Sequence, residues 1–393
     1  MWKKWMHRIL AVIFVSLLCP ICVFAENKEQ EEVISVEAPY ALLMEVSTGK
    51  ILYEKEAHTA MPPASVTKVM TMLLILEALE NGRIQLEDPV TVSEKAASMG
   101  GSQVYLETGE KQTVDTMLKC IAIASANDAC VAMAEHISGS EEAFVKQMNE
   151  RSKVLGMQNT HFVNCNGLDA EGHVTSAYDI ALMSRELLLN HPQIHEYCTV
   201  WMDTIIHTTA KGSQEFGLTN TNKLVRQYEY CTGLKTGSTD DAGFCISAAA
   251  KKDEMELIAV IMKGETSKSR FRDAASLLNY GFANYRIYKD TDADRNTLEK
   301  IRVKGGIKTE IQPVYEKEFT CLLTNAENSS EIQKRLELPE ELSAPVAEGQ
   351  VIGTLIYDYG TEKKGEIKIL AGEGTEAATY LDCVKRVWLA WMM

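Results

Sequence analysis

The stretch PPASVTKVMTMLL, residues 62–74, places a serine and a lysine at the start of a long apolar run. Two prolines end the preceding segment, and the apolar residues after them predict a helix over about 65–80 that stops near Asn81 and Gly82. Ser65 and Lys68 then lie on one helix face. A lysine activates a serine hydroxyl when burial or a second cation lowers the pKa of its amine. The alternative is that Ser65 only caps the helix.

The same Ser-x-x-Lys pattern occurs a second time, at Ser47 and Lys50. Here the surrounding residues, APYALLMEVSTGKILYEKEAH (38–58), predict two strands joined by a turn at 47–50. Nothing in a hairpin turn fixes the amine against the hydroxyl. The pattern by itself is therefore weak, and its position in the fold must decide.

Two further short motifs follow along the chain. Ser125-Ala126-Asn127 is a short polar segment between two apolar helical runs. The alternative interpretation is that these residues only cap a helix at a kink. Lys235-Thr236-Gly237 lies where we expect a strand to begin, and the glycine leaves room for a ligand backbone to approach. Its alternative is a strand end with a turn glycine. Lys235 supplies the second cation that the Ser65–Lys68 pair requires.

Composition limits the classes of protein that fit. The chain has 393 residues, which favours two domains, and a formal net charge of −15, which argues against nucleic-acid binding. Residues 1–25 combine positive charge, an apolar core and small residues before a possible cleavage position after Ala25, and so predict a cleaved signal peptide. The alternative is a retained membrane helix. We interpret most of the eight later cysteines as unpaired core residues.

The order of patterns suggests an α+β domain followed by a small all-β domain. Helical periods dominate 84–200, two strands occupy GFCISAAAKKDEMELIAVIMKG (243–264), and a helix covers about 269–285. The stretch 286–298 is polar and lacks an apolar period. Short alternating segments such as KIRVKGG, EFTCLLT and VIGTLIYDYG then predict strands.

The last residues, YLDCVKRVWLAWMM, form an amphipathic helix in this interpretation. Lys385 and Arg386 lie opposite an apolar face made of positions 380, 381, 384, 387, 388, 391 and 392. The stretch is shorter than the ~20 residues that span a bilayer. It fits a helix lying in a membrane interface, or alternatively one docked on the β-domain.

Together and in this order, the three motifs resemble those of the penicillin-recognising serine enzymes. The segments PPASVTKVMT, SANDACVAMAE, THFVNCNGL, SAYDIALM and GLKTGSTDDAGFC are similar to the serine-type D-alanyl-D-alanine carboxypeptidases, the low-molecular-weight penicillin-binding proteins. The resemblance implies an α+β, β-lactamase/transpeptidase-like catalytic domain over 37–286, with an antiparallel sheet, flanking helices and a helical subdomain. It further implies a small β-sandwich over 297–375 and an anchoring helix over 377–393.

The same resemblance assigns roles to residues. It implies Ser65 as the acylated nucleophile, Lys68 as its general base and Ser125 as a proton relay. Backbone N–H groups of Ser65 and Ser238 would form the oxyanion hole, and 99–110 would border the groove. The remaining implied residues contact the substrate: Asn127, Lys235, Thr236, Gly237, Ser238 and, as an aid to carboxylate binding, Arg270.

The implied reaction removes the terminal D-alanine from peptidoglycan stem peptides outside the cytoplasmic membrane, without a metal or organic cofactor, and β-lactam antibiotics would acylate Ser65. One rival is a class A-type β-lactamase, whose Glu-x-x-Leu-Asn motif has a match at 186–190, although that match continues a helical period. Another rival is a non-catalytic scaffold. Metal hydrolysis through His191 and His195 is weaker, because Pro192 intervenes and no glutamate adjoins the first histidine.

Overall fold

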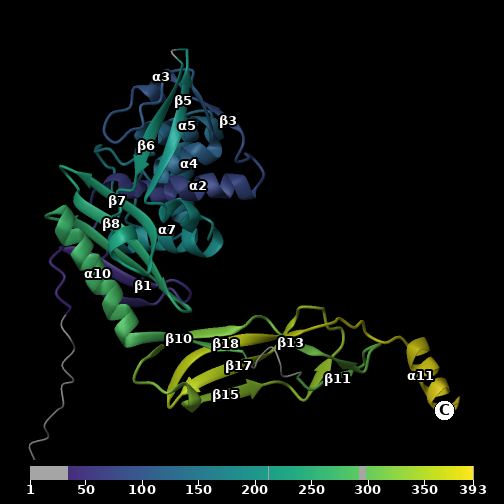
Figure 1. Cartoon of the computed structure of the whole chain (residues 1–393). Helices are drawn as coiled ribbons and strands as arrows, with labels where there is room; N and C mark the ends of the chain where they lie inside the picture. Colours follow the sequence, from purple (N-terminus) through teal and green to yellow (C-terminus); the bar gives the residue numbers. More distant parts are fainter. Residues whose placement is uncertain (1–33, 211, 292–297, 393) are drawn as a thin grey trace, which may run out of the picture. The chain divides into compact units, whose positions relative to one another are not determined.

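The computed structural model describes residues 34–210, 212–291 and 298–392 (Figure 1). The predicted signal peptide, residues 1–25, lies outside the described residues. The described chain consists of an α+β domain and a following all-β domain, which confirms the predicted fold class.

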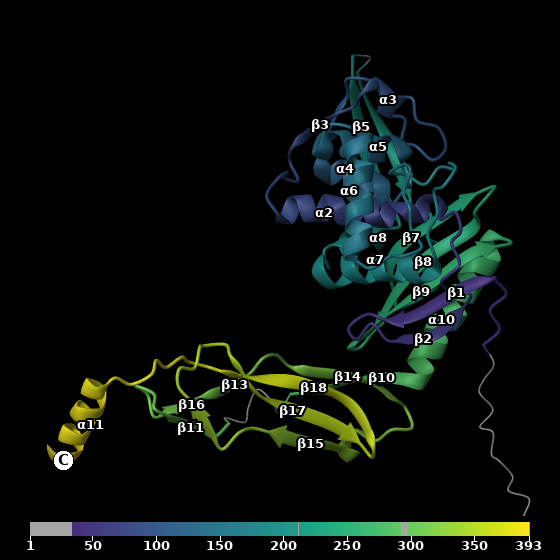
Figure 2. The same cartoon turned by 180° about the vertical axis from the view of Figure 1, so that it is seen from behind.

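A five-stranded antiparallel sheet forms the centre of the first domain. Its order is β2-β1-β9-β8-β7, and the strands are β1 (Tyr40–Glu45), β2 (Ile51–Lys55), β7 (Cys231–Thr239), β8 (Gly243–Lys252) and β9 (Met255–Gly264). Helix α10 (Ser267–Asn284) covers one face and α7 (Ala177–Asn190) the other (Figures 1 and 2). Consecutive residues Val260 and Ile261 are therefore both fully buried, although their side chains point to opposite faces.

The predicted helices are present beside this sheet. Short helix η1 (Ala64–Thr67) leads directly into α2 (Lys68–Glu80), which is buried on nearly all sides and forms the centre of the helical subdomain. The other helices are α3 (Glu94–Ala97), α4 (Val114–Ala122), α5 (Asn127–Ser138), α6 (Glu141–Val154), α8 (Ile194–Cys198) and α9 (Leu224–Gln227).

The hairpin of β5 (Met202–Thr209) and β6 (Gly212–Thr219) was not predicted from the sequence. Only Ile205 in β5 and Leu218 in β6 are buried, so neither strand carries a full apolar alternation. The short pair β3 (Pro89–Thr91) and β4 (Lys111–Thr113) was missed for the same reason.

The second domain is built from short strands, as predicted. They are β11 (Ile301–Lys304), β12 (Glu310–Ile311), β13 (Pro313–Tyr315), β14 (Phe319–Thr324), β15 (Ile332–Glu337), β16 (Glu341–Ser343), β17 (Val351–Tyr359) and β18 (Glu362–Ala371), with the short helix η2 (Ser329–Glu331) between β14 and β15. In its core, the rings of Phe319 and Tyr357 stack at 3.6 Å. The polar stretch that begins at 286 also contributes a strand, β10 (Tyr285–Asp290), which pairs with β14.

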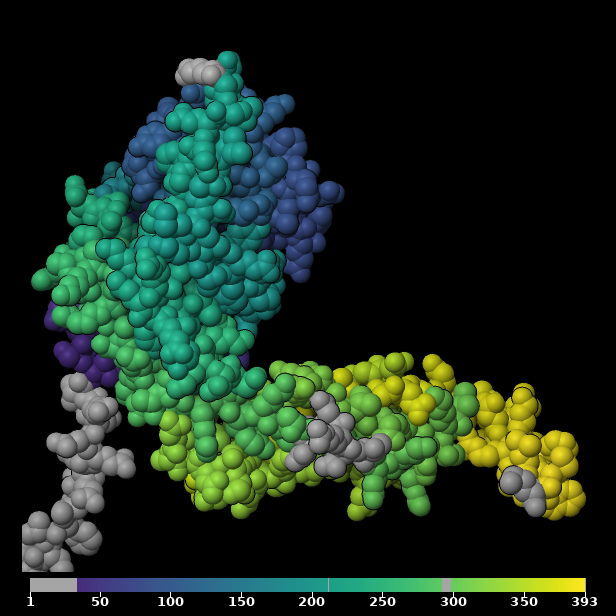
Figure 3. All heavy atoms as spheres, viewed as in Figure 1, coloured from purple at the N-terminus to yellow at the C-terminus, as the bar shows by residue number. Residues whose placement is uncertain are grey.

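Helix α11 (Tyr380–Met392) ends the described chain and is drawn in yellow in Figure 3. Its large apolar side chains are exposed. Trp391 is 85% and Tyr380 82% exposed. Arg386 is bound to the β-domain, because its Nη2 donates to the carbonyls of Gly306 and Ile307 at 2.8 and 3.0 Å. Among the described helices, none has the length and apolar character needed to cross a membrane.

The predicted placement of the cysteines in the core is confirmed. Five of them lie in the apolar core of the first domain and Cys321 lies in that of the second; the five are Cys120, Cys130, Cys165, Cys198 and Cys245. Burial raises the pKa of the Cys130 thiol to about 12, so it is protonated at neutral pH.

Candidate active site

Ser65 lies inside the short helix η1 and does not cap it. Pro63 is the N-cap and provides no side-chain cap bond, so the capping alternative is wrong. The preceding residue, Ala64, adopts a left-handed backbone with φ 49°. This conformation is strained for a residue with a Cβ, and such strain is typical of functional sites.

Lys68 is fully buried, and its amine contacts three oxygen atoms. Nζ lies 2.9 Å from Ser65 Oγ, 2.7 Å from Asn127 Oδ1 and 2.6 Å from the Asn166 carbonyl oxygen. Burial lowers the pKa of this amine below its usual value. Ser65, Lys68 and Asn127 therefore meet in one hydrogen-bonded group, although Asn127 comes from another helix.

The Ser125-Ala126-Asn127 segment connects α4 to α5 and contains a residue with a strained backbone. Ser125 is buried and has φ 62°, another left-handed residue with a Cβ. The N-cap of α5 is Ala126, without a side-chain cap bond, so the cap alternative fails here too. Asn127 turns its Oδ1 to Lys68 and donates from Nδ2 to the Gly100 carbonyl at 2.7 Å.

Lys235 is buried in strand β7 with its Nζ 3.0 Å from the Thr236 carbonyl. Burial, and next the positive charge of Lys68, lower the pKa of Lys235 to about 7. The two amines are thus close enough to repel one another. Burial is the main cause of the lowered pKa of Lys68, whereas the sequence suggested a neighbouring cation as an equal possibility.

Gly237 packs against the backbone of Ser65. A Cβ at this position would lie 2.7 Å from the Ser65 backbone nitrogen and 2.9 Å from that of Val66. The sequence suggested space for a ligand backbone, and the structure fills that space with η1. Gly237 also lies within β7, so it is not a turn glycine after a strand end.

Arg270 is hydrogen-bonded to strands β7 and β8. Its Nη1 donates to the carbonyls of Gly237 and Cys245 at 2.8 and 3.2 Å, and burial lowers its pKa to about 10. Its guanidinium also lies over the ring of Phe271 at 4.7 Å. These contacts position the Lys-Thr-Gly strand.

Several residues of the site were not predicted. The Asn166 carbonyl binds Lys68, and Thr221 accepts a hydrogen bond from Thr236 Oγ1 at 2.7 Å. The Asp128 carboxylate accepts from the backbone N–H groups of Val104 and Leu106 and so fastens the loop beside Asn127. Asn166 and Asp128 had a signal in the sequence, through the segments THFVNCNGL and SANDACVAMAE, whereas Thr221 had none.

The residues of the rival functions lie elsewhere. Glu186 is in α7, as the helical period predicted, and forms an ion pair with Arg151, which also pairs with Glu77. The two histidines have separate partners: His195 Nδ1 lies 3.0 Å from the Thr232 carbonyl, whereas His191 lies 3.8 Å from Glu80. None of these contacts of Glu186, His191 and His195 involves Ser65.

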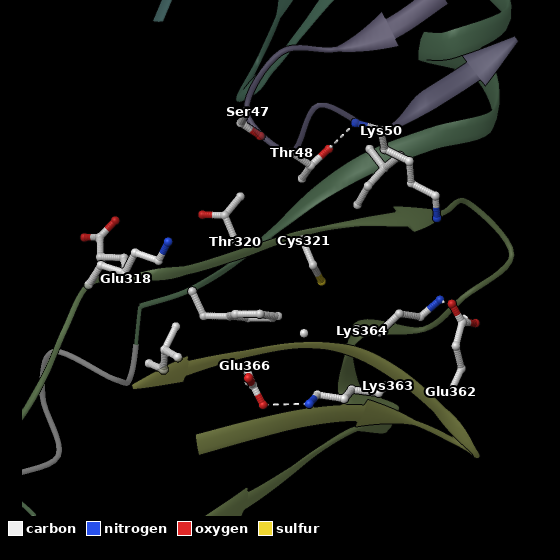
Figure 4. Close-up of a pocket in the computed structure, with 15 residues that line it drawn as sticks. Ser47, Thr48, Lys50, Glu318, Thr320, Cys321, Glu362, Lys363, Lys364 and Glu366 are labelled. Atoms are coloured by element: carbon white, nitrogen blue, oxygen red, sulfur yellow. Dashed lines mark hydrogen bonds and ion pairs between the residues drawn. The ribbon is translucent and has the colours of Figure 1, made fainter. Parts of the chain in front are cut away.

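A separate hollow is lined by the 47–50 turn and by strands β14 and β18 (Figure 4). Its charged side chains are largely paired, since Lys363 binds Glu366 and Lys364 binds Glu362. None of the predicted site residues lines it. We therefore place the candidate site at Ser65.

Comparisons with known proteins agree with this arrangement. The family model of D-alanyl-D-alanine carboxypeptidases matches residues 25–266, and that of the penicillin-binding protein 5 C-terminal domain matches 286–377. D-alanyl-D-alanine carboxypeptidase DacF of Bacillus subtilis is 40% identical over 98% of this chain and 99% of its own.

Solved structures show the same likeness. Penicillin-binding protein 5 from Haemophilus influenzae superposes with a TM-score of 0.75 at 30% identity, covering 87% of this chain and 98% of its own. Penicillin-binding protein D2 from Listeria monocytogenes, in its ampicillin-bound form, superposes with a TM-score of 0.55 at 32% identity, covering 62% of this chain and 97% of its own. This chain therefore belongs to the D-alanyl-D-alanine carboxypeptidase family of penicillin-binding proteins.

Proposed function

We propose that this protein is a serine-type D-alanyl-D-alanine carboxypeptidase that removes the terminal D-alanine from peptidoglycan stem peptides through an acyl-enzyme on Ser65. The observation that carries the proposal is the set of partners around the Lys68 amine. Ser65 Oγ, Asn127 Oδ1 and the Asn166 carbonyl oxygen all lie within 2.9 Å of it.

These partners accommodate both protonation states of the amine. As an ammonium, Lys68 donates one hydrogen to each of the three oxygens. When the amine is neutral, the oxygens of Asn127 and Asn166 take its two hydrogens and its lone pair faces Ser65 Oγ. Burial lowers the pKa of Lys68 and so increases the neutral fraction.

The reaction then follows in two steps. Lys68 accepts the hydroxyl proton as Ser65 Oγ attacks the carbonyl carbon between the two terminal D-alanines, and the C–N bond breaks when the leaving amine receives a proton through Ser125. Water then hydrolyses the ester, with Lys68 again as base. The N–H groups of Ser65 and Ser238 stabilise the oxyanion, a contribution often worth about 3 kcal/mol per donor.

Substrate binding is assigned to the groups around β7. Lys235 and Thr236 hold the terminal carboxylate, Asn127 binds the peptide amide, and Gly237 lets the strand approach the nucleophile. A substrate carboxylate beside Lys235 would favour its charged form, because opposite charges raise the pKa of an amine. A β-lactam would occupy the same groups and acylate Ser65. Arg270 contributes by holding the Gly237 and Cys245 carbonyls.

The substrate requires an extracytoplasmic enzyme, and we assign three segments to that location. Residues 1–25 act as the export signal, 37–286 form the catalytic domain, and 297–375 form the β-sandwich. Helix α11 lies on the membrane surface. This proposal is supported by its exposed Trp388 and Trp391, which the hydrogen bond from Arg386 to the Gly306 carbonyl of the β-domain leaves uncovered.

One experiment separates the candidate functions. The purified protein is incubated with a fluorescent penicillin and, separately, with a peptide ending in D-Ala-D-Ala. Lasting label together with released D-alanine is the expected result. Rapid turnover of the penicillin without peptide cleavage would identify a β-lactamase, and the absence of both signals would identify a scaffold.

Membrane attachment is tested by sedimentation with vesicles of phosphatidylglycerol and phosphatidylcholine. We expect the full chain to sediment with them and a Trp388→Ser/Trp391→Ser variant to stay in solution. The matched control is Leu336→Ser, which alters an exposed apolar residue of the β-domain. Equal sedimentation of all three proteins would contradict the assignment of α11.

A further inference from the structure

A hydrogen-bonded chain links a buried histidine to the backbone beside the nucleophile. His173 Nδ1 accepts from the Val163 N–H at 2.9 Å, and His173 Nε2 lies 2.8 Å from Thr67 Oγ1. Thr67 Oγ1 in turn lies 2.9 Å from the Ala64 carbonyl oxygen, to which it donates. Thr67 and His173 are both buried, with exposed fractions of 0% and 3%.

The partners fix the direction of each bond. Because a backbone N–H always donates, His173 Nδ1 accepts, and the ring proton of the neutral imidazole is on Nε2. Nε2–H therefore donates to Thr67, whose own proton goes to the Ala64 carbonyl, a group that only accepts. His173 Nδ1 also accepts from the Asn164 N–H at 3.4 Å, and an imidazole that accepts at Nδ1 is neutral.

The chain ends at a strained peptide of the site. Ala64 has φ 49°, and a Cβ on Gly167 would overlap the Ala64 carbonyl. The segment that carries Gly167 also supplies the Asn166 carbonyl to Lys68. His173 thus joins this segment to η1, the short helix that contains Ser65.

We propose that His173 is a positioning residue for acylation: its neutral imidazole, acting through Thr67, holds the strained Ala64–Ser65 peptide and the Asn166 carbonyl in register with Lys68. The proposal rests on the function proposed above. It assigns to His173 no contact with substrate, only the geometry of the groups that react.

The charged and titratable groups that face His173 are few. The pKa of His173 is lowered to about 4, mainly by burial and next by the charge of His161, whereas Asp169 acts in the opposite direction. Phe162 packs its ring edge-on at 5.9 Å. The imidazole is consequently neutral at the pH at which the enzyme is assayed, as the hydrogen-bond directions require.

The test uses the full chain and the rate of acylation by a fluorescent penicillin. We expect His173→Ala to lower the second-order acylation rate by about 10- to 100-fold, the effect of misplacing reacting groups by about an ångström. Glutamine has an NH₂ group that donates and a carbonyl oxygen that accepts, and it does not ionise, so His173→Gln should recover most of the rate. The matched control is His161→Ala, an exposed histidine on the same segment, which should react like the unsubstituted protein.

Three results would overturn the proposal: an unchanged rate in His173→Ala, equal losses in the alanine and glutamine variants, or an equal loss in His161→Ala. If His173→Ala does not fold, Thr67→Val and Thr67→Ser provide the same test, since only the serine keeps the hydroxyl. Complete labelling after long incubation shows that a variant is folded. Failure of the proposed function is distinguishable, because the unsubstituted protein would then either take no label or lose it rapidly without releasing D-alanine from the peptide.

Discussion

The two Ser-x-x-Lys sequences of this chain end in opposite environments. Lys68 is fully buried, with three oxygen partners, whereas Lys50 lies in an exposed turn. The hydroxyl of Ser47 is bound to the Glu45 carboxylate, a residue of its own hairpin. The hydroxyl of Ser65 contacts the amine three residues later. Identical spacing therefore gives a buried, hydrogen-bonded serine–lysine pair in one place and an exposed turn in the other.

This contrast indicates that the lysine amine can activate the serine hydroxyl only where the lysine is buried. A lysine in water keeps its proton at neutral pH and cannot accept another. Burial raises the free energy of the charged form, and only a packed domain can provide it. Each prediction below changes one feature that the pair 65/68 has and the pair 47/50 lacks.

The largest effect is expected from removing the reactive groups. Ser65→Ala should abolish covalent labelling by penicillin, and Lys68→Ala should lower the acylation rate by about 10²- to 10⁴-fold, as for loss of a general base. Ser47→Ala and Lys50→Ala are the matched controls and should keep the normal rate. Labelling of the Ser65→Ala protein would refute the assignment of the nucleophile.

A second prediction concerns the glycine that encloses the nucleophile. Gly167→Ala combines a positive φ of 89° with overlap of the Ala64 carbonyl, so we expect a loss of at least about 3 kcal/mol in the free energy of unfolding. In the 47–50 turn, Gly49 also has a positive φ, of 70°. A Cβ at Gly49 would have Arg185 Nε as its nearest atom, at 3.2 Å, and this atom belongs to a long side chain that can move.

Gly49→Ala should therefore cost about 1–2 kcal/mol, the strain alone. Denaturant unfolding of both variants measures the two values. Equal losses would show that close packing against η1 adds nothing to the backbone strain.

A third prediction follows from the lowered pKa of Lys68. Acylation needs the neutral amine, so its rate should rise with pH and level off once Lys68 has lost its proton. The midpoint reports the pKa of the free enzyme and should lie below 10.5, the usual value for lysine. The profile of Lys50→Met should coincide with that of the unsubstituted protein. A rate independent of pH between 6 and 9 would count against Lys68 as the base.

The smallest effect concerns the stability of the buried support. The pKa of His173 is about 4 in the folded state and about 6.5 when unfolded, so the unfolded chain binds more protons between these values. Stability due to this residue is complete above pH 6.5 and decreases as the pH falls toward 4. At pH 5 the loss amounts to ~2 kcal/mol.

Replacing the histidine with glutamine removes that dependence. The free energy of unfolding, measured at pH 7 and pH 5, should fall less in His173→Gln than in the unsubstituted protein, while other groups titrate alike in both. An identical decrease in the two proteins would show that His173 is not held neutral.

Local sequence patterns determined much of this protein. The 47–50 turn, helix α2 and helix α7 were predicted because the residues that form each one are neighbours in the chain. The hairpin of β5 and β6 and the strand β10 were missed, because few of their residues are buried and no periodic pattern marks them. The order of the three motifs, together with the family resemblance, pointed to the residues of the site.

Only the tertiary structure decided which Ser-x-x-Lys is equipped to react. The partners of Lys68 come from Asn127 and Asn166, far away in sequence, and the support of Ser65 comes from Gly237 and His173. No local pattern encodes such contacts, because they form only when distant segments pack together and exclude water. The local sequence named a serine and a lysine, and the folded chain buries that lysine in low-dielectric surroundings that lower the pKa of its amine.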